Sequence, residues 1–323
     1  MSTISNAPTI LKDFLSYHET VKAHSAKTVD EYFLDLRTFF RYLKRSRGLV
    51  SPDTPWDSIS IADVDLELVG SVSLSEIYDY LIFLSRERQL NTASLARKIA
   101  AIRSFYRYLT SKAHLLEENP VQELDSPRMK KTLPRYLTLE ESLALLDAVQ
   151  GKNKERDYCI LMLFLNCGLR ISELVNLNVS DIQDDTIRVL GKGNKERILY
   201  LNDGCKAALE SYLTVRAMLS LQHEPALFVS NRRTRIPRAG IHKMVKKRLL
   251  TAGLDASKYS AHKLRHTAAT LMLQNGVDVR TLQEVLGHDH LNTTQIYTHI
   301  SSDDLKIAAR ANPLADARQK KGS

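Results

Sequence analysis

The sequence has few cysteines and no long apolar run, and each shortage excludes a class of protein. None of its three cysteines forms a Cys-x-x-Cys pair, and Cys159 and Cys167 lie in an apolar run with helical spacing. We therefore expect small core residues in a reducing compartment, which excludes a disulfide scaffold. No run approaches the ~20 apolar residues that a membrane span needs, and the N-terminus has no basic-then-apolar leader. A cytoplasmic protein is expected.

Lysine and arginine are missing from residues 49–85, which hold seven acidic residues. Because the whole chain carries a net charge of +9, the remainder carries +16. A basic body with one acidic flank suits a polyanionic partner on one side. Basic proteins are common, so charge alone favours nucleic acid only modestly.

The length and the hydrophobic pattern indicate two domains. A chain of 323 residues is long enough for two cores, and 43% hydrophobic with 26% charged residues is ordinary for a globular protein. In residues 1–125, apolar positions recur at helical spacing, which predicts four amphipathic helices and so a small helical bundle. The four segments are 10–21, 28–43, 75–88 and 92–110, with a proline-containing loop at 48–60.

Residues 126–136 predict a basic linker between the domains. The stretch loses helical periodicity, reads SPRMKKTLPR over 126–135, and carries Lys130 and Lys131 without any acid. The helix before it places Arg97 and Arg103 between its apolar positions, either as a solvated face or as a face against phosphates. A basic linker between basic domains suits a clamp around a duplex.

The second domain, residues 137–323, opens with a predicted helix capped by Thr138 and Glu141. A long apolar helix then ends at Gly168, and Arg170 begins the next helix. Glu173 lies one turn on, so its carboxylate can hold the guanidinium of Arg170. The alternative is an ordinary surface salt bridge of little energy.

A β-hairpin follows, because the period changes to two over residues 186–190 and 197–201 around a turn at 191–194. The tip places Lys192 between two glycines. This Gly-Lys-Gly lacks the spacing of a P-loop and precedes a strand, which excludes a nucleotide triphosphatase. Lys192 is either a solvated turn lysine or a group that reaches into a site.

Residues 231–250 hold eight lysines or arginines and no acid, interleaved with apolar residues at helical spacing. This density favours a basic helix that faces DNA over a neutral solvent-exposed face. The candidate DNA contacts here are Arg232, Arg233, Lys243 and Lys247.

The chemistry concentrates in residues 262–299. Ser260 is expected to cap a helix whose first turn carries His262 and Arg265 on its less apolar side. Free backbone donors at a helix N-terminus favour an anion there. A second helix is bounded by Asp278 and Gly287. His288 follows it directly, and Tyr297 belongs to a last short helix that Asn292 can cap.

A metal site competes with an anion site in this segment. His262 and His266 have the four-residue spacing of zinc ligands, but no glutamate completes an HExxH motif. Lys263 and Arg265 between them make a cation electrostatically unfavourable, so we expect no metal. Tyr297 could also be a core aromatic with its hydroxyl hydrogen-bonded.

Five motifs occur in order: GLRISEL at 168–174, GKGNKER at 191–197, HKLRH at 262–266, LGH at 286–288 and IYTH at 296–299. Together they resemble the tyrosine recombinase (phage-integrase) family, most closely the Xer type, although residues 49–72 are longer and more acidic than in that group. The resemblance implies a mainly α fold that forms a C-shaped DNA clamp. Its parts are an N-terminal SAM-like core-binding bundle and a mixed, mostly α catalytic domain with a small β-hairpin or sheet.

The resemblance also implies the role of each site residue. Tyr297 is the nucleophile that forms a 3′-phosphotyrosyl link and releases a 5′-hydroxyl. Arg170 and Arg265 clamp the phosphate, and Lys192 is the general acid. His262 handles a proton and His288 donates to the phosphate. No metal or other cofactor is implied.

The implied activity is site-specific recombination through a Holliday junction, by a tetramer assembled on double-stranded DNA, in the resolution of chromosome or plasmid dimers. Three alternatives stay open: an integrase of a mobile element, a topoisomerase-like nick-rejoining enzyme and a non-catalytic DNA-binding regulator. The target sequence and the need for a second recombinase or a regulatory protein are also open.

Overall fold

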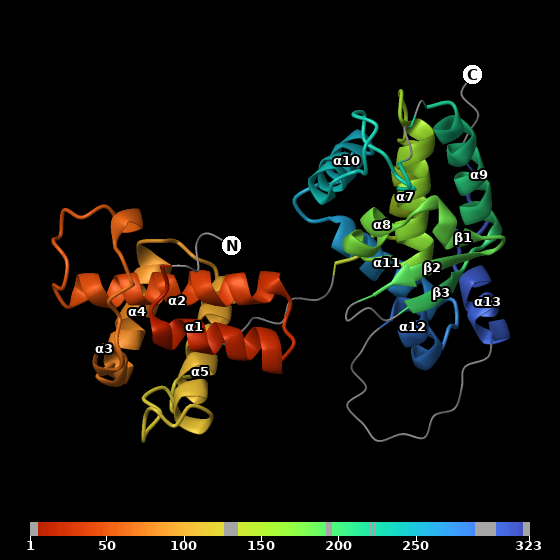
Figure 1. The fold of residues 1–323 in the computed structure, drawn as a ribbon. Coiled ribbons are helices and arrows are strands. Elements are labelled where there is room, and N and C mark those ends of the chain that lie inside the picture. Colours follow the sequence, from red (N-terminus) through yellow and green to blue (C-terminus); the bar gives the residue numbers. More distant parts are fainter. Residues whose placement is uncertain are drawn as a thin grey trace. The chain divides into compact units, whose positions relative to one another are not determined.

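The computed structural model is mainly helical, with a small sheet (Figure 1). It describes residues 6–125, 135–191, 196–219, 221, 224–287 and 302–318. The chain divides into two units, Met1–Thr132 and Leu133–Ser323. Both are mainly helical, and the second contains a small sheet, as predicted. The predicted linker at 126–136 lies outside the described residues except for its last two.

The first unit contains the four predicted helices and one that periodicity missed. Ser25 and Asn91 cap two of them, and Ser73 with Glu76 forms a capping box on a third. The missed helix has five residues, which is too short to display an amphipathic period. The helices are α1 (Thr9–Ser16), α2 (Ala26–Ser46), α3 (Leu66–Gly70), α4 (Leu74–Arg86) and α5 (Thr92–Ser111), with a π-helical turn at Tyr17–Val21 and a 3₁₀ turn at Trp56–Ser58.

An aromatic core joins these helices. Phe39 and Phe40 from α2, Tyr80 from α4, and Phe105 and Tyr106 from α5 are fully buried. The hydroxyl of Tyr106 donates to a backbone carbonyl in α3 at 2.9 Å, so the short helix is fixed to the bundle by a satisfied buried polar group.

The acidic stretch of the first unit is bound by cations on α2 and at its C-cap. Arg41 pairs with Asp57, and Lys44 pairs with Asp63 at 2.6 Å. Arg47, one further turn along, pairs with Glu76 at 2.7 Å. Three of the seven acidic residues therefore neutralise neighbouring helix cations instead of only facing solvent.

The second unit is built around a buried helix, α7, which packs against α9 and α11 (Figure 1). Every residue of α7 from Asp157 to its end is buried. The elements are α6 (Leu139–Asp147), α7 (Lys154–Cys167), α8 (Ile171–Asn176), β1 (Ile182–Gln183), β2 (Thr186–Leu190), β3 (Glu196–Tyr200), α9 (Asp203–Ala217), α10 (Arg238–Thr251), α11 (Ala261–Gln274), α12 (Val279–Leu286) and α13 (Ser302–Arg310). Cys159 and Cys167 are free and buried, which confirms the prediction of small core residues.

The three strands form an antiparallel sheet in the order β1-β2-β3, with Arg188 opposite Ile198. The hairpin of β2 and β3 was predicted, whereas the two-residue β1 was not. Residues 192–195 at its turn, including Lys192, lie outside the described part of the chain.

Helices α7 and α12 each end at a glycine with a left-handed backbone conformation. Gly168 ends α7 with φ 58° and Gly287 ends α12 with φ 63°, as the sequence predicted. A Cβ on Gly168 would lie 2.5 Å from Cδ2 of Leu286. Close packing as well as φ therefore requires glycine at position 168.

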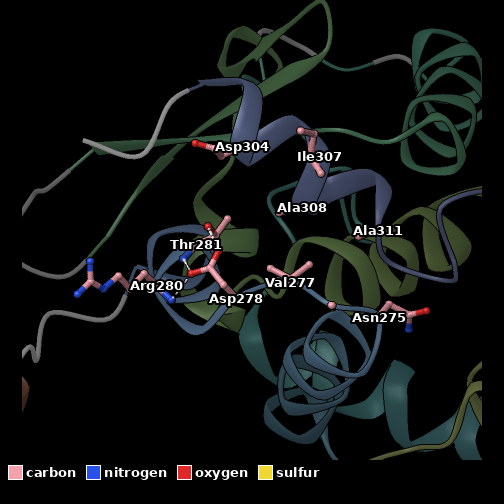
Figure 2. A pocket seen from close by; sticks show the side chains of 10 residues that line it. Asn275, Val277, Asp278, Arg280, Thr281, Asp304, Ile307, Ala308 and Ala311 are labelled. Atoms are coloured by element: carbon pink, nitrogen blue, oxygen red, sulfur yellow. Dashed lines mark hydrogen bonds between the residues drawn. The ribbon is translucent and has the colours of Figure 1, made fainter. Parts of the chain in front are cut away.

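A cavity of about 450 Å³ opens at the other end of α12 (Figure 2). Asp278 caps that end and accepts from the backbone N–H groups of Arg280 and Thr281. Ile307 and Ala308 of α13 line the opposite side. In the described residues, no helix is long and apolar enough to cross a membrane.

Candidate functional site

Glu173 is a buried carboxylate surrounded by three arginines. Its side chain is 3% exposed. Arg170 donates to Oε1 at 2.7 Å, and Arg197 donates from its two Nη atoms to Oε1 and Oε2, both at 2.9 Å. Arg265 Nη1 lies 3.9 Å from Oε2. The predicted support of Arg170 by Glu173 is therefore present, and burial distinguishes it from an ordinary surface salt bridge.

Local helix geometry presents the first pair. Arg170 is the N-cap of α8 and Glu173 is its third residue. Besides the side-chain contact, Oε2 of Glu173 accepts from the backbone N–H of Arg170 at 2.8 Å. The carboxylate therefore holds both the main chain and the guanidinium of Arg170, as in a capping box.

Three consecutive carbonyls at the C-terminal end of α12 each accept a hydrogen bond from a different arginine. The oxygen of Val285 accepts from Arg197 Nε at 3.3 Å. The oxygen of Leu286 accepts from Arg265 Nη2 at 2.7 Å, and that of Gly287 accepts from Arg170 Nη2 at 2.8 Å. Carbonyls in the last turn of a helix have no partner within the helix and form its negative end, so guanidinium groups satisfy them well.

Arg265 is more enclosed than the sequence indicated. It was expected on the less apolar side of α11, but its side chain is 6% exposed. The reason is that it reaches two helix ends, with Nη1 donating to the oxygen of Gly168 at 2.6 Å and Nη2 to Leu286. The side chain of Arg170, by contrast, is 35% exposed, so this guanidinium can contact a ligand from solvent.

The cluster has an excess of positive charge. Burial alone would raise the pKa of the Glu173 carboxyl, but the hydrogen bonds and charges of Arg197 and Arg170 outweigh it and lower that pKa. Burial, together with the charges of Arg170 and Arg197, lowers the pKa of Arg265 to about 10. Three guanidinium groups thus share one carboxylate, an arrangement that favours an added anion.

His262 lies one residue inside the N-terminus of α11 and is exposed. Partial burial, followed by the charges of Arg265 and Lys263, lowers the pKa of its imidazole below the ordinary 6.5. The ring is therefore neutral at pH 7 and can accept a proton. Ser260 is the N-cap of α11, as predicted, but its side chain makes no capping hydrogen bond.

His266 stacks edge-on against His262, with ring centroids 4.8 Å apart. The described residues contain no group of three or more histidine, cysteine or acidic side chains that could hold a metal ion. The cations of the same helix lower the pKa of His266 as well. Electrostatics in this part of the chain thus favour an anion over a metal.

Several predicted residues lie outside the described part of the chain. These are Lys192, His288 and Tyr297 of the expected active site, and Lys130 and Lys131 of the linker. Their roles stay predictions. The described residues bring together Arg170, Glu173 and Arg265. His262 lies on the same helix as Arg265, and the charge of Arg170 contributes to lowering the pKa of its imidazole.

The candidate DNA contacts have different surroundings. Arg97 is half exposed and pairs with the buried Asp35 at 2.8 Å, while its neighbour Lys98 is buried and pairs with the same carboxylate at 2.9 Å. Arg103 is half-buried. The candidates in and before α10 are exposed: Arg232, Arg233, Lys243 and Lys247.

The basic helix α10 has one cation in the core. Arg248 is 6% exposed on its side chain and donates to Asp157 Oδ2 at 2.5 Å. The lysines at 243, 246 and 247 are exposed, opposite the buried Met244 and Val245. The predicted basic helix is therefore present, with Arg248 as a structural exception, and its contact with DNA stays a prediction.

Sequence reasoning missed Arg197, which donates to both oxygens of Glu173 and to the carbonyl of Val285. One signal was available. Arg197 precedes the buried Leu199 by two positions on β3, so strand alternation directs its side chain to the buried face. A cation in that register requires a buried acidic or carbonyl partner.

Two family models match this chain. The phage integrase family matches residues 135–303, which is more than half of the sequence. The phage integrase N-terminal SAM-like domain matches residues 11–113. The two matched ranges fall on the two units of the structure.

Individual relatives agree with the family models. The chain is 52% identical over 309 residues to "Tyrosine recombinase XerC" of Caldanaerobacter subterraneus subsp. tengcongensis, covering 95% of this chain and 88% of that protein. Two solved structures share the fold: XerH recombinase bound to palindromic difH substrate, and a lambda integrase tetramer bound to a Holliday junction. The first has 23% identity, a TM-score of 0.64 and coverage of 93% and 84%; the second has 18%, 0.62, and 91% and 81%. The chain belongs to the phage integrase family and is a Xer-type tyrosine recombinase.

Proposed function

We propose that this protein breaks and rejoins double-stranded DNA at a specific site through a covalent link to Tyr297, with the arginines around Glu173 binding the scissile phosphate. The observation that carries this proposal is the excess of guanidinium groups over carboxylates. Arg170 and Arg265 are held rigidly by main-chain carbonyls and Glu173. Preorganised donors stabilise developing charge without reorganising during the reaction.

Each step has a residue assigned to it. The phenol of Tyr297, with an ordinary pKa near ~10, attacks phosphorus and forms a 3′-phosphotyrosyl bond, while the bond to the 5′-oxygen breaks. His262, neutral at pH 7 because of its lowered pKa, is the group that handles the phenol proton. Lys192 protonates the leaving oxygen and His288 donates to the phosphate.

The reaction needs no metal or nucleotide cofactor in this scheme. The guanidinium charges neutralise the phosphate, which is the electrostatic work that a divalent cation does elsewhere. The phosphotyrosyl bond retains the energy of the phosphodiester, so the 5′-hydroxyl of a partner strand can displace Tyr297 and reseal the DNA.

The two units have different tasks. Residues 1–125 form a core-binding domain, 126–136 a basic linker and 137–323 the catalytic domain, and both domains contact the duplex. Arg97 and Arg103 contact phosphates from the first domain, with Lys130 and Lys131 in the linker. Arg232, Arg233, Lys243 and Lys247 do so from the second domain.

The acting assembly is a tetramer on two recombination sites, through a Holliday junction. The structure of lambda integrase, which shares this fold, is a tetramer on such a junction. The similarity to XerC supports a role in resolving chromosome or plasmid dimers in the cytoplasm. A second recombinase or a regulatory protein is the candidate partner.

Trapping on a suicide substrate tests the proposal. Duplex DNA nicked beside the cleavage site loses the short 5′-hydroxyl strand, so the covalent adduct accumulates. We expect the wild-type chain to form it and Tyr297→Phe to form none, with Tyr259→Phe as the matched control that keeps it. An adduct with Tyr297→Phe, or none with the wild type, contradicts the proposal. A two-site strand-exchange assay separates recombination from relaxation of supercoils alone.

A further inference from the structure

Arg197 binds three groups of the catalytic cluster without facing solvent. Its Nη1 and Nη2 donate to the two oxygens of Glu173, and its Nε donates to the carbonyl of Val285. Its side chain is 13% exposed, compared with 35% for Arg170. All three nitrogens of this guanidinium thus donate to acceptors inside the protein, so Arg197 links Glu173 to the end of α12.

We propose that Arg197 is a positioning residue for DNA strand cleavage: it fixes Glu173 and the last turn of α12, and through them the guanidinium groups of Arg170 and Arg265. This inference rests on the proposed function. No role for Arg197 follows from the motif roles assigned above.

A ring of hydrogen bonds joins β3, α8 and the end of α12, and through it Arg197 can influence the position of Arg170. Oε1 of Glu173 accepts from both Arg197 and Arg170. Arg170 also donates to the carbonyl of Gly287, two residues beyond the Val285 carbonyl that Arg197 holds. The Glu173 carboxylate therefore links Arg197 of β3 to Arg170 at the start of α8, and both arginines bind the end of α12. Loss of Arg197 removes its contacts with Glu173 and with the carbonyl of Val285.

The end of α12 is also the anchor of Arg265, which donates to the carbonyl of Leu286 between the other two. A shift of that turn therefore displaces both arginines that are proposed to clamp the phosphate. Gly287 packs directly on Arg197, since a Cβ there would lie 3.1 Å from Cδ and Nη1 of the arginine. Misplacement of reacting groups by about 1 Å can cost about 10²-fold in rate.

The planar guanidinium is needed because two parallel bonds meet both carboxylate oxygens while a third reaches the helix end. A lysine retains the charge but only one donor atom, so it can replace part of this arrangement. The expected order of activity is therefore wild type, then Arg197→Lys, then Arg197→Ala.

Single-turnover cleavage of the suicide substrate at saturating protein, with the DNA dissociation constant measured separately, tests the inference. We expect Arg197→Ala to slow cleavage by about 10²-fold with an unchanged dissociation constant, and Arg197→Lys to recover part of the rate. Arg188→Ala is the control: it lies on the neighbouring strand, is 50% exposed and pairs with Asp181 and Glu196. Its cleavage rate stays at the wild-type value.

A double-mutant cycle separates positioning from an independent contribution. If Arg197 acts through Glu173, combining Arg197→Lys with Glu173→Gln slows cleavage no further than the slower single variant. Defects whose logarithms add overturn the inference. So does a loss of DNA affinity that accounts for the whole loss of cleavage, because that pattern belongs to a phosphate-binding arginine.

Hydrogen exchange provides a readout that does not need catalysis. In the full chain with Arg197→Lys, amides of α12 close to residues 285–287 exchange faster, whereas those of α9 do not change. Equal exchange in variant and wild type overturns the inference, and so does faster exchange throughout the second unit. If the wild type forms no covalent adduct, the proposed function fails and the exchange measurement alone decides the role of Arg197.

Discussion

Two clusters, one in each unit, pair cations with carboxylates in different proportions. In the first unit, Arg41 and Lys44 of α2 and Arg47 at its C-cap each face a separate acidic residue. In the second unit, Arg170, Arg197 and Arg265 share the single carboxylate of Glu173. Both sets of cations also bind main-chain carbonyls, so the difference lies in the number of carboxylates.

The ratio of cations to carboxylates determines whether such a cluster can bind an added anion. Where each cation has its own carboxylate, the group is close to neutral and its effect is to fasten a segment, here the acidic stretch between α2 and α4. Where one carboxylate serves three cations, the group is held in place but keeps net positive charge, so it can accept an anion. Substitutions in the two clusters should therefore affect different measurements.

The largest expected effect comes from Arg265→Ala in the second unit. The variant removes a guanidinium that is proposed to bind the scissile phosphate, so we expect single-turnover cleavage to fall by about 10²–10³-fold while DNA still binds. Lys258→Ala, which breaks an exposed pair with Asp255, is the control and should cleave normally. Cleavage by Arg265→Ala at the wild-type rate would mean that the uneven cluster is structural, like its counterpart in the first unit.

A smaller effect, on stability, is expected from Arg41→Ala in the first unit. Arg41 is buried and donates to the carbonyl of Ile59 and to Asp57. Because Asp57 is almost fully exposed, the loss comes mainly from the freed carbonyls and is about 1–2 kcal/mol in the free energy of unfolding. Denaturant titration measures it.

The matched control on the same helix is Lys27→Ala, which removes an exposed pair with Glu31 and should change stability little. The cleavage rate of DNA-bound Arg41→Ala should equal that of the wild type. A cleavage defect in this variant without a stability loss would contradict the division between the two clusters.

The smallest effect is a pH dependence of the Arg47–Glu76 pair. The hydrogen bond from Arg47 lowers the pKa of the Glu76 carboxyl from 4.5 to about 2. A depressed pKa in the folded state means that the pair stabilises the protein above about pH 4.5 and that this contribution fades as the pH falls towards 2. The stability difference between wild type and Glu76→Gln should shrink over that range, as measured by denaturant titration at each pH. A constant difference would exclude the ion pair as its source.

The parts of the fold that depend on neighbouring residues in the sequence were predicted well. Caps such as Thr138 and Asp278 and the glycine ends at 168 and 287 mark boundaries through interactions within a few residues. The support of Arg170 by Glu173 falls in the same class. These signals act over one helical turn, so a sequence displays them directly.

What the sequence could not display are pairings across long separations. Glu173 and Arg197 are 24 residues apart, and Arg170 meets the carbonyl of Gly287 over 117 residues. Main-chain acceptors have no residue-type signal at all. For the same reason the sequence marked α5 as a basic face without revealing that Lys98 is buried against Asp35 from another helix.

The hold of three arginines on the main chain of α12 has a consequence for how the protein tolerates change. A carbonyl oxygen is the same atom whichever side chain its residue carries, so replacing Val285 with another apolar residue leaves the acceptor of Arg197 in place. Gly287 is different, because its φ of 63° is strained for other residues and an added Cβ would lie 3.1 Å from Arg197, which would have to shift. Substitutions in this turn are thus limited by side-chain volume and by Gly287. Most single substitutions leave in place the carbonyls that bind the three arginines.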